Sequence, residues 1–190
     1  MYFDLKSIFQ NIASIKNVDF QFKESTWFNG TMNCAQFVYS LNYKHQSVNI
    51  KVEGVWRKNS YSKQNAWLQE DDTDFYLWEL SFAHPNSTST FSLEGPKGLS
   101  RWIGNKSISV SSNNSELTKL FLNSGTLKNL FNEKHSFNGQ VVSRYNKVSL
   151  KFDTKRNHNE AISNAILTIE KISEIVTKDL STHVKSDVQD

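Results

Sequence analysis

The sequence is poor in cysteine: among its 190 residues Cys34 stands alone, and a disulfide within the chain needs two cysteines. A zinc site built mainly from cysteines is excluded for the same reason. Small proteins of oxidising compartments often depend on disulfides, so a single cysteine favours a reducing compartment. We therefore expect a cytoplasmic protein in which Cys34 is a small buried residue rather than a nucleophile.

The chain also lacks long apolar runs and a strong excess of either charge. No stretch approaches the ~20 consecutive apolar residues that a membrane-spanning helix needs. Residues 1–16 contain neither the basic nor the unbroken apolar part of a secretory signal. Lys and Arg number 22 against 19 Asp and Glu, which gives a formal net charge of +3. We expect no membrane association, and the charge alone does not predict a nucleic-acid partner.

Large aromatic side chains are abundant, since 13% of the residues are aromatic and the chain has five Trp and thirteen Phe. This composition argues against disorder and predicts a core of large side chains. A chain of this length buries roughly 70% of its unfolded surface without needing disulfides or metals. Because we find no internal repeat and no shift in composition, we expect one α+β domain over residues 1–180 and a frayed polar tail over 181–190.

Apolar residues at intervals of three and four predict helices near both ends of the chain. One helix is expected over residues 4–16 and a long one over 159–180, with two short helices near 115–132, the first capped by Ser115. The apolar stripe of the first helix consists of Leu5, Ile8, Phe9, Ile12 and Ile15. The stripe of the long helix consists of Ile162, Ile166, Ile169, Ile172, Val176 and Leu180. Each stripe is typical of a helix that packs on a sheet.

Two segments with alternating apolar residues flank the polar loop 44–47 and predict a β-hairpin. Pairing Tyr43 with Val48 and Leu41 with Ile50 places the large apolar side chains on one face. Further strands are expected over residues 18–23, 91–93 and 108–110 and in a second hairpin over 137–152. The strands therefore occupy the middle of the chain.

Segment 75–82 has apolar residues on both parities, which is typical of a central strand covered on both sides. Glu79 lies within it, where a buried carboxylate could act as an acid or a base. Strand alternation instead favours an open sheet face at Glu79, so we interpret this residue as solvent-facing. A polar loop over 57–65 precedes the strand, and Gly54 indicates a bulge or bend before that loop.

The order of these elements predicts an α+β fold, with an antiparallel sheet of about 6–8 strands and segregated helices. The same order also allows a partly closed barrel similar to a pleckstrin-homology domain, capped by the C-terminal helix. The two architectures differ in whether the sheet closes on itself.

An acidic cluster before segment 75–82 offers the candidate metal site. Its candidate ligands are Glu70, Asp71, Asp72, Asp74 and His84. Crowded carboxylates repel one another, and a bound Mg²⁺ or Ca²⁺ would relieve that repulsion. The spacing is not that of an EF-hand, and neighbouring residues of an extended chain point in opposite directions. We therefore favour a solvated acidic flank that keeps an apolar strand soluble, and we expect no cofactor.

Two further sets of residues are candidate binding surfaces. The aromatic set consists of Trp27, Phe28, Trp67 and Trp102, which lie in or beside expected loops. Grouped together they could form a recognition surface, or they could fold over the open ends of the sheet. The basic set is Arg144, Lys147 and Lys151, which could bind phosphates or an acidic protein. Alternation also explains the basic set as the solvent-facing side of a strand.

No motif occurs in the structural context that its chemistry requires, so the sequence does not indicate a reaction and favours a protein that is not an enzyme. We expect a non-catalytic intracellular protein-interaction module, such as an adaptor, inhibitor or immunity-type protein of a bacterium or phage. Its expected partner is another protein, or a second copy bound through the C-terminal helix. One alternative is a metal-dependent hydrolase that uses the 70–74 carboxylates. A second is anion or nucleic-acid binding through the basic patch at 144–156.

Overall fold

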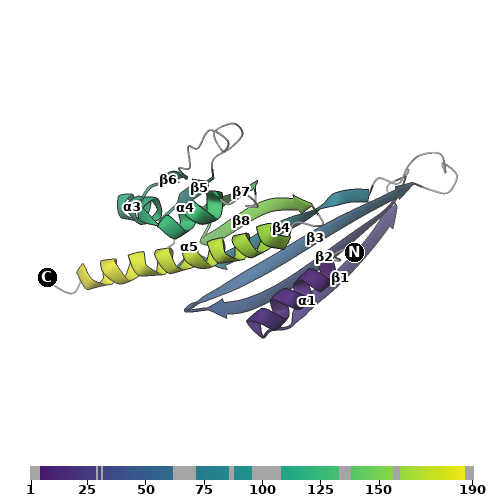
Figure 1. Cartoon of the computed structure of the whole chain (residues 1–190), viewed down its shortest axis with the longest axis horizontal. Helices are drawn as coiled ribbons and strands as arrows, with labels where there is room; N and C mark the ends of the chain where they lie inside the picture. Colours follow the sequence, from purple (N-terminus) through teal and green to yellow (C-terminus); the bar gives the residue numbers. More distant parts are fainter. Residues whose placement is uncertain are drawn as a thin grey trace.

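The computed structural model of the chain describes residues 5–28, 30, 32–61, 72–85, 88–95, 108–132, 138–155 and 159–186. Its helices are α1 (Leu5–Lys16), α3 (Ser115–Asn123), α4 (Gly125–Asn132) and α5 (Asn159–Ser186). Its strands are β1 (Phe20–Phe28), β2 (Met32–His45), β3 (Val48–Tyr61), β4 (Asp72–Ala83), β5 (Phe91–Glu94), β6 (Ser109–Ser112), β7 (Asn138–Arg144) and β8 (Lys147–Lys155). They form the predicted α+β fold around one antiparallel sheet (Figure 1).

The sheet is open, with eight strands in the order β1-β2-β3-β4-β8-β7-β5-β6. Since β1 and β6 lie at opposite ends of this order and do not pair within the described part of the chain, the alternative of a partly closed barrel is wrong. β4 lies in the middle of the sheet, as the pattern over 75–82 predicted. It joins the β1–β4 meander to the β7–β8 hairpin.

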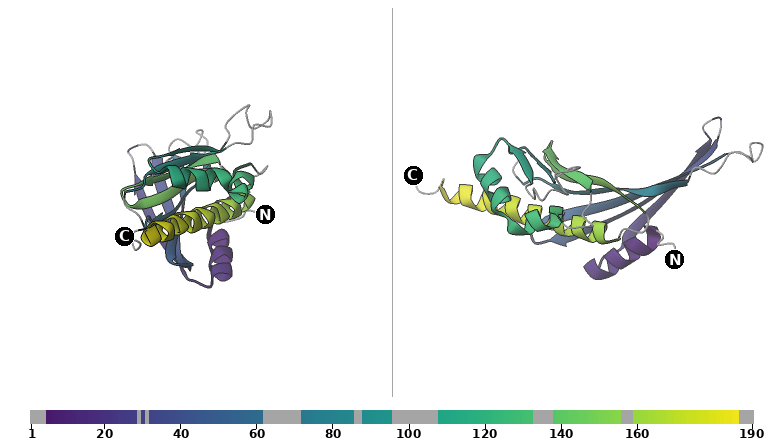
Figure 2. Two further views of the ribbon diagram at one scale, coloured as in Figure 1. Left: turned by 90° about the vertical axis from the view of Figure 1, so that its left-hand side faces the viewer. Right: turned by 45° about the horizontal axis from the view of Figure 1, so that its top comes forward.

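Both long helices, α1 and α5, lie on the same side of the sheet (Figure 2). The alternation of β4 explains why, because Trp78 and Leu80 point to this side and are buried. Leu77 and Glu79 point to the other side, where Leu77 is 43% exposed. The prediction that this strand is covered on both sides is therefore wrong. No described helix covers this second face, on which Leu77 and Ala83 are exposed and Glu79 is half-buried.

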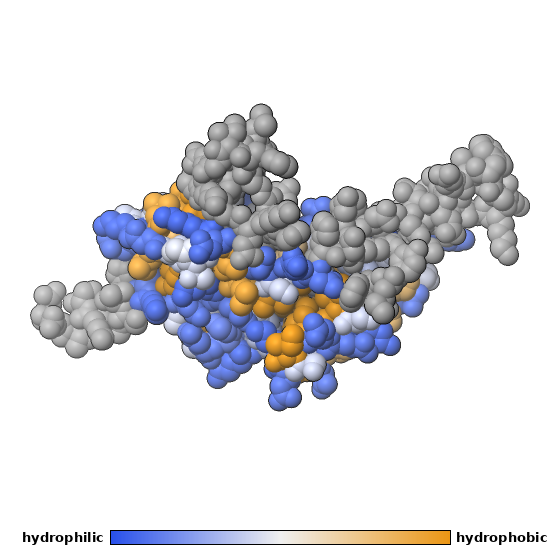
Figure 3. Space-filling view, in the orientation of Figure 1, coloured by the Kyte–Doolittle hydropathy of each residue, from blue (hydrophilic) through white to orange (hydrophobic). Residues whose placement is uncertain are grey.

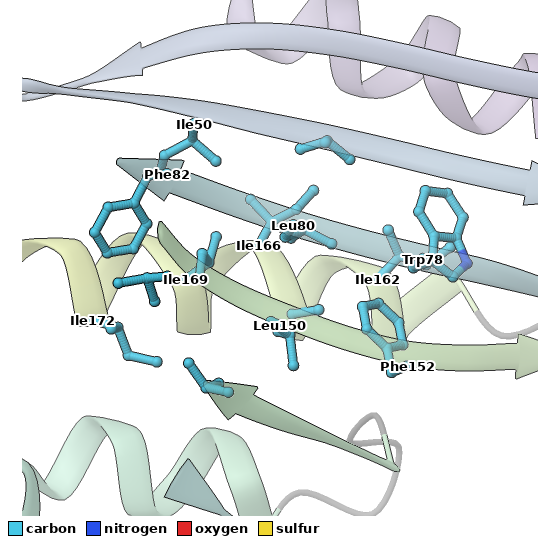
Figure 4. Close-up of a cluster of buried hydrophobic side chains, with 14 of the residues drawn as sticks. Ile50, Trp78, Leu80, Phe82, Leu150, Phe152, Ile162, Ile166, Ile169 and Ile172 are labelled. Atoms are coloured by element: carbon cyan, nitrogen blue, oxygen red, sulfur yellow. The ribbon is translucent and has the colours of Figure 1, made fainter. Parts of the chain in front are cut away.

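The main core forms where α5 crosses β4 and β8 (Figure 4). Ile162, Ile166, Ile169 and Ile172 of α5 lie beside the side chains of both strands. On the strands, the indole of Trp78 stacks on Phe152 and donates a hydrogen bond of 2.9 Å to the Thr154 hydroxyl. The part of this stripe from Ile162 to Val176, which the sequence also allowed for a homodimer through this helix, is thus buried in the chain's own core.

Gly54 allows α1 to approach the sheet closely, and the expected bulge or bend at this position is wrong. A Cβ at Gly54 would lie 2.7 Å from Cε2 of Phe9 and 3.0 Å from Cζ3 of Trp78. Gly54 pairs regularly with Tyr39, and the irregularity of β3 falls later, between Trp56 and Lys58. The missing side chain therefore serves packing rather than a break in the strand.

The first hairpin forms with the predicted faces but with a different register. His45 pairs with Val48, and Tyr43 pairs with Ile50 rather than Val48. The turn is therefore only two residues long, and its first residue, Gln46, has a φ of 53°. Two-residue turns with positive φ match the twist of antiparallel strands, so they are preferred over the wider loop. Because the register differs by two residues, every side chain keeps its predicted face.

Several elements are longer than the sequence predicts. β1 continues from the expected end at Lys23 to Phe28, and β3 extends through Tyr61 into the expected loop. α5 continues to Ser186, into the expected frayed tail. Strand pairing and helix packing supply hydrogen bonds and burial that a weak local pattern does not show. No helix in the described part of the chain is long and apolar enough to cross a membrane.

The two short helices lie where the sequence predicts them, but the cap is one residue earlier. Asn114, rather than Ser115, has the extended backbone of an N-cap. Its side-chain oxygen accepts a hydrogen bond of 3.1 Å from the amide of Leu117. Both α3 and α4 pack on α5, and α3 also contacts β6.

Candidate functional site

A groove of about 330 Å³ lies between α1 and α5, on the helix side of the sheet. We call it the interhelix groove. It is lined by Ser7, Ile8, Asn11, Ile12, Ile15 and Lys16 of α1 and by Asn159, Ile162, Ser163, Ile166 and Leu167 of α5. Volumes of this order are typical of binding sites that are mostly apolar with a few polar groups. The groove is therefore the best-formed candidate site on the helix side.

Helix periodicity explains why these residues share the groove. The lining residues of each helix recur at intervals of three and four, so they form one face of α1 and one face of α5. Ile12 and Ile162 are buried at the base. Ile15 and Leu167 lie at the rim and are 70% and 50% exposed. In the space-filling view, hydrophobic surface is visible between the two helices (Figure 3). Two large apolar side chains thus face solvent across one opening.

A cluster of polar side chains lies at the Lys16 end of the groove and connects three elements. We call it the interhelix cluster; it consists of Lys16, Tyr43, His45, Glu170 and Glu174. Glu170, which is buried on α5, accepts a hydrogen bond of 2.8 Å from the Tyr43 hydroxyl and one of 2.5 Å from Nζ of Lys16. Nε2 of His45 lies 3.2 Å from Oε1 of Glu174. The cluster therefore joins α1, β2 and α5 through side chains.

The electrostatics of the interhelix cluster favour a fixed structure over proton transfer. Burial raises the pKa of Tyr43 well above its usual range, and the charge and hydrogen bond of Glu170 raise it further. The hydrogen bond from Lys171 lowers the pKa of Glu174, with His45 adding to the effect, although burial opposes it. Near neutral pH the phenol of Tyr43 keeps its proton and Glu174 stays ionised. Neither side chain changes its protonation state near neutral pH, as a general acid or base must do during a reaction.

The predicted aromatic set is only partly described. Trp27 and Phe28 lie at the end of β1, where they are 45% and 58% exposed. As neighbours on a strand they point to opposite faces of the sheet, so they do not form one joint patch. Trp67 and Trp102 lie outside the described residues. Any grouping of Trp27 or of Phe28 with Trp67 and Trp102 therefore stays a prediction.

The predicted basic set lies on the open face of the sheet, where one carboxylate offsets part of its charge. Lys147 and Lys151 both bind Glu79, with Nζ to carboxylate distances of 2.5 Å and 3.3 Å. Burial alone would raise the pKa of Glu79, but the hydrogen bonds from the two lysines outweigh it and lower the pKa. Arg144 pairs in register with Lys147 next to the turn. Because the two lysines share the carboxylate of Glu79, their electrostatic attraction for a phosphate is weaker.

The candidate metal ligands are not brought together by the described backbone. Glu70 and Asp71 lie outside the described residues, as do the side chains of Asp72 and Asp74 on β4. His84 follows the opposite end of β4, about ten residues or roughly 33 Å of extended strand from Asp74. Within the described ranges, no group of three or more His, Cys, Asp or Glu residues could hold a metal ion. His84 instead lies buried against Phe91, and burial lowers its pKa.

Sequence reasoning missed the interhelix groove and the interhelix cluster. The apolar stripe of α1 was assigned to the core as a whole, yet Ile15 at its end remains exposed. One available signal was Glu170, a charged residue in the middle of an apolar helix stripe, which needs a buried partner. The partner itself, Tyr43, lies 127 positions away in sequence, so local patterns could not identify it.

Three kinds of comparison with known proteins found no relative of the chain. No family model, no curated protein and no solved structure matches the chain.

Proposed function

We propose that the protein is a non-catalytic protein-interaction module, in the manner of an adaptor, inhibitor or immunity-type protein. The interhelix groove receives the apolar face of a helix from another protein. The observation that carries the proposal is the pair of exposed apolar side chains, Ile15 and Leu167, on either side of an apolar groove. Burying these two side chains in a complex would be favourable by roughly 25 cal/mol for each Å² of apolar surface removed from water.

The dimensions of the groove fit a short amphipathic helix. The lining runs from Ser7 to Lys16 on α1 and from Asn159 to Leu167 on α5, which at 1.5 Å per residue is roughly 12–14 Å on each wall. A partner helix with apolar residues at i, i+3 or i+4, and i+7 covers roughly 10 Å. Three such side chains would fill the length of the groove.

The walls of the groove favour a helix over an extended peptide. An added strand binds through unpaired backbone groups at a sheet edge, whereas the walls here are helices whose backbone groups are bonded internally. The polar side chains that line the groove, Ser7, Asn11, Asn159 and Ser163, are uncharged. Lys16 already binds Glu170. We therefore expect the partner helix to present an apolar stripe flanked by neutral polar residues.

Selection from a library of displayed helical peptides tests this proposal. The bait is the full chain, compared with an Ile15→Glu, Leu167→Glu double variant in which both rim side chains become charged. Leu120→Glu on α3 is the matched control, because Leu120 is 41% exposed and lies outside the lining of the groove. We expect wild type and control to enrich peptides with apolar residues at helical spacing and the double variant to enrich none.

A second experiment uses natural ligands from a lysate of the source organism. A protein captured by wild type and by Leu120→Glu, but lost with the double variant, would support the proposal. Ligands that bind all three baits equally, or a wild type that enriches no peptide and captures no protein, would contradict it. Circular dichroism of each variant shows whether a loss of binding comes from unfolding.

A further inference from the structure

Within the described part of the chain, the outer edge of β1 is an unpaired sheet edge. β1 is the first strand of the sheet, and no described strand pairs with its outer side. Every residue from Gln21 to Phe28 is exposed, including the large side chains of Phe22 and Trp27. Long edge strands normally carry proline, a bulge or several charges that prevent pairing with another chain. β1 has no proline and pairs with β2 without a bulge, and its only charges are Lys23 and Glu24.

The hydrogen-bond pattern of the sheet indicates which backbone groups of β1 point outward. His45 and Val48 flank a two-residue turn, so they exchange backbone hydrogen bonds with each other, and every second residue of β2 does the same with β3. The residues between them, such as Gln36, therefore bond to β1, and Gln36 pairs with Ser25. It follows that Phe22, Glu24, Thr26 and Phe28 direct their N–H and C=O groups away from the sheet.

The side chains of β1 allow it to pair with itself in one favourable register. When two copies meet about a two-fold axis perpendicular to the sheet, residues of the same parity lie opposite each other. A register centred on Lys23 or on Glu24 places like charges opposite each other, which is unfavourable, and one centred on Phe22 or on Thr26 pairs only five residues of β1 with the second copy. The register centred on Ser25 places Phe22 opposite Phe28 and Lys23 opposite Trp27, with no like charges opposite. Aromatic pairs and a lysine beside an indole are both favourable contacts.

We infer that β1 binds β1 of a second copy in this antiparallel, Ser25-centred register. The two sheets then form one continuous sheet, with the helices of both copies on the same side. Helix α1 leaves room for the contact, because Leu5, its first described residue, lies beside Gly54, at the level of Tyr39 and Phe22. Residues 24–28 extend past that level. The exposed aromatic residues Trp27 and Phe28 thereby obtain Lys23 and Phe22 of the second copy as partners.

Sedimentation and light scattering of the full chain test the pairing. We expect wild type at micromolar concentration to have twice the 21.9 kDa mass of the chain. Thr26→Pro removes an outward N–H without removing a hydrogen bond to β2, and edge positions of this kind tolerate proline. We expect this variant to have the mass of a single chain, as does Ser25→Lys, which places two lysines opposite each other. Thr26→Val keeps the N–H and serves as the matched control, with an expected mass twice that of the chain.

Cysteine cross-linking reads the register directly. Single cysteines replace Lys23, Glu24 or Ser25 in a Cys34→Ala background, which removes the native thiol. In the Ser25-centred register the two Ser25 residues lie opposite each other without exchanging backbone hydrogen bonds. The Cα atoms of such a pair are close enough for a disulfide. We expect mild oxidation to give a covalent dimer with Ser25→Cys and little with the other two cysteines.

A wild type that remains a single chain overturns the inference, and so does a dimer that forms equally well with Thr26→Pro. A dimer that cross-links through position 23 or 24 overturns the register. The inference does not depend on the interhelix groove, because Ile15 and Leu167 lie on the helices and the double variant there keeps β1 intact.

Discussion

The two faces of the sheet differ in what holds their side chains in place. On the helix side of β4, Trp78 and Leu80 are enclosed by α1, α5 and neighbouring strands. On the open side, Glu79 is held by Lys147 and Lys151 in contact with solvent. Adjacent residues of one strand thus experience a dry, apolar environment and a wet, charged one. Their contributions to stability should therefore differ severalfold, and substitutions on each face measure the difference.

Removal of the Trp78 side chain should have the largest effect. Its indole stacks on Phe9 and Phe152, at centroid distances of 5.5 Å and 6.3 Å, and it is almost fully buried. We expect Trp78→Ala to lower the free energy of unfolding by about 3–5 kcal/mol, measured by chemical denaturation. Leu77→Ala, one residue away on the open face, is the control and should lose under about 1 kcal/mol. Equal losses would contradict the contrast between the faces.

A side chain added at Gly54 should have the next largest effect. Because its Cβ would lie 2.7 Å from Cε2 of Phe9, the Phe9 ring or α1 itself must shift. We expect Gly54→Ala to cost about 1–3 kcal/mol in thermal or chemical unfolding. Gly125→Ala is the matched control, since a Cβ there meets nothing within 4 Å. A neutral Gly54→Ala would mean that α1 does not pack as described.

Tyr43→Phe tests a polar contact on the buried side. The variant removes the hydroxyl that donates to Glu170 and leaves Lys16 in place. Hydrogen bonds to charged groups contribute more than neutral ones, so we expect a loss of about 1.5 kcal/mol in denaturant unfolding. Tyr145→Phe, at a residue that is 98% exposed, shows how much of any loss comes from removing a phenol hydroxyl elsewhere. A loss no greater than that of the control would mean that the hydrogen bond to Glu170 does not contribute to the free energy of unfolding.

Glu79→Gln should have the smallest effect, and that effect should depend on pH. The folded-state pKa of Glu79 is lowered from 4.5, so its contribution is present above that value and is lost as pH falls through the folded pKa. We expect a loss under about 1 kcal/mol at neutral pH, since the ion pairs are exposed to solvent. Denaturation at neutral and strongly acidic pH should show wild type and variant converging in acid. A difference that persists in acid would assign the effect to packing.

Part of this contrast was predictable from the sequence. The alternation of Trp78, Glu79 and Leu80 predicts which side chains share a face, because a strand has a strict period of two. The same period could not fix the register of the first hairpin. Shifts by two residues preserve the faces, and the choice depends on the turn at Gln46.

The candidate site was much less predictable than the fold. The interhelix groove depends on the distance at which α1 and α5 pack on one sheet, and this distance is set by contacts such as that of Gly54 with Phe9. Glu170 and Tyr43 meet only because two distant segments fold onto each other. Neither the periodicity of one helix nor the alternation of one strand contains that information.

The interhelix cluster has a consequence for the order of folding. Lys16 is separated from its partner Glu170 by 154 positions, so all eight described strands must be synthesised before this ion pair forms. Contacts so distant in sequence form slowly, since a long loop must close first. On the ribosome, α1 emerges well before its anchor on α5. This helix thus receives its attachment to Glu170 only after the strands of the sheet have been synthesised.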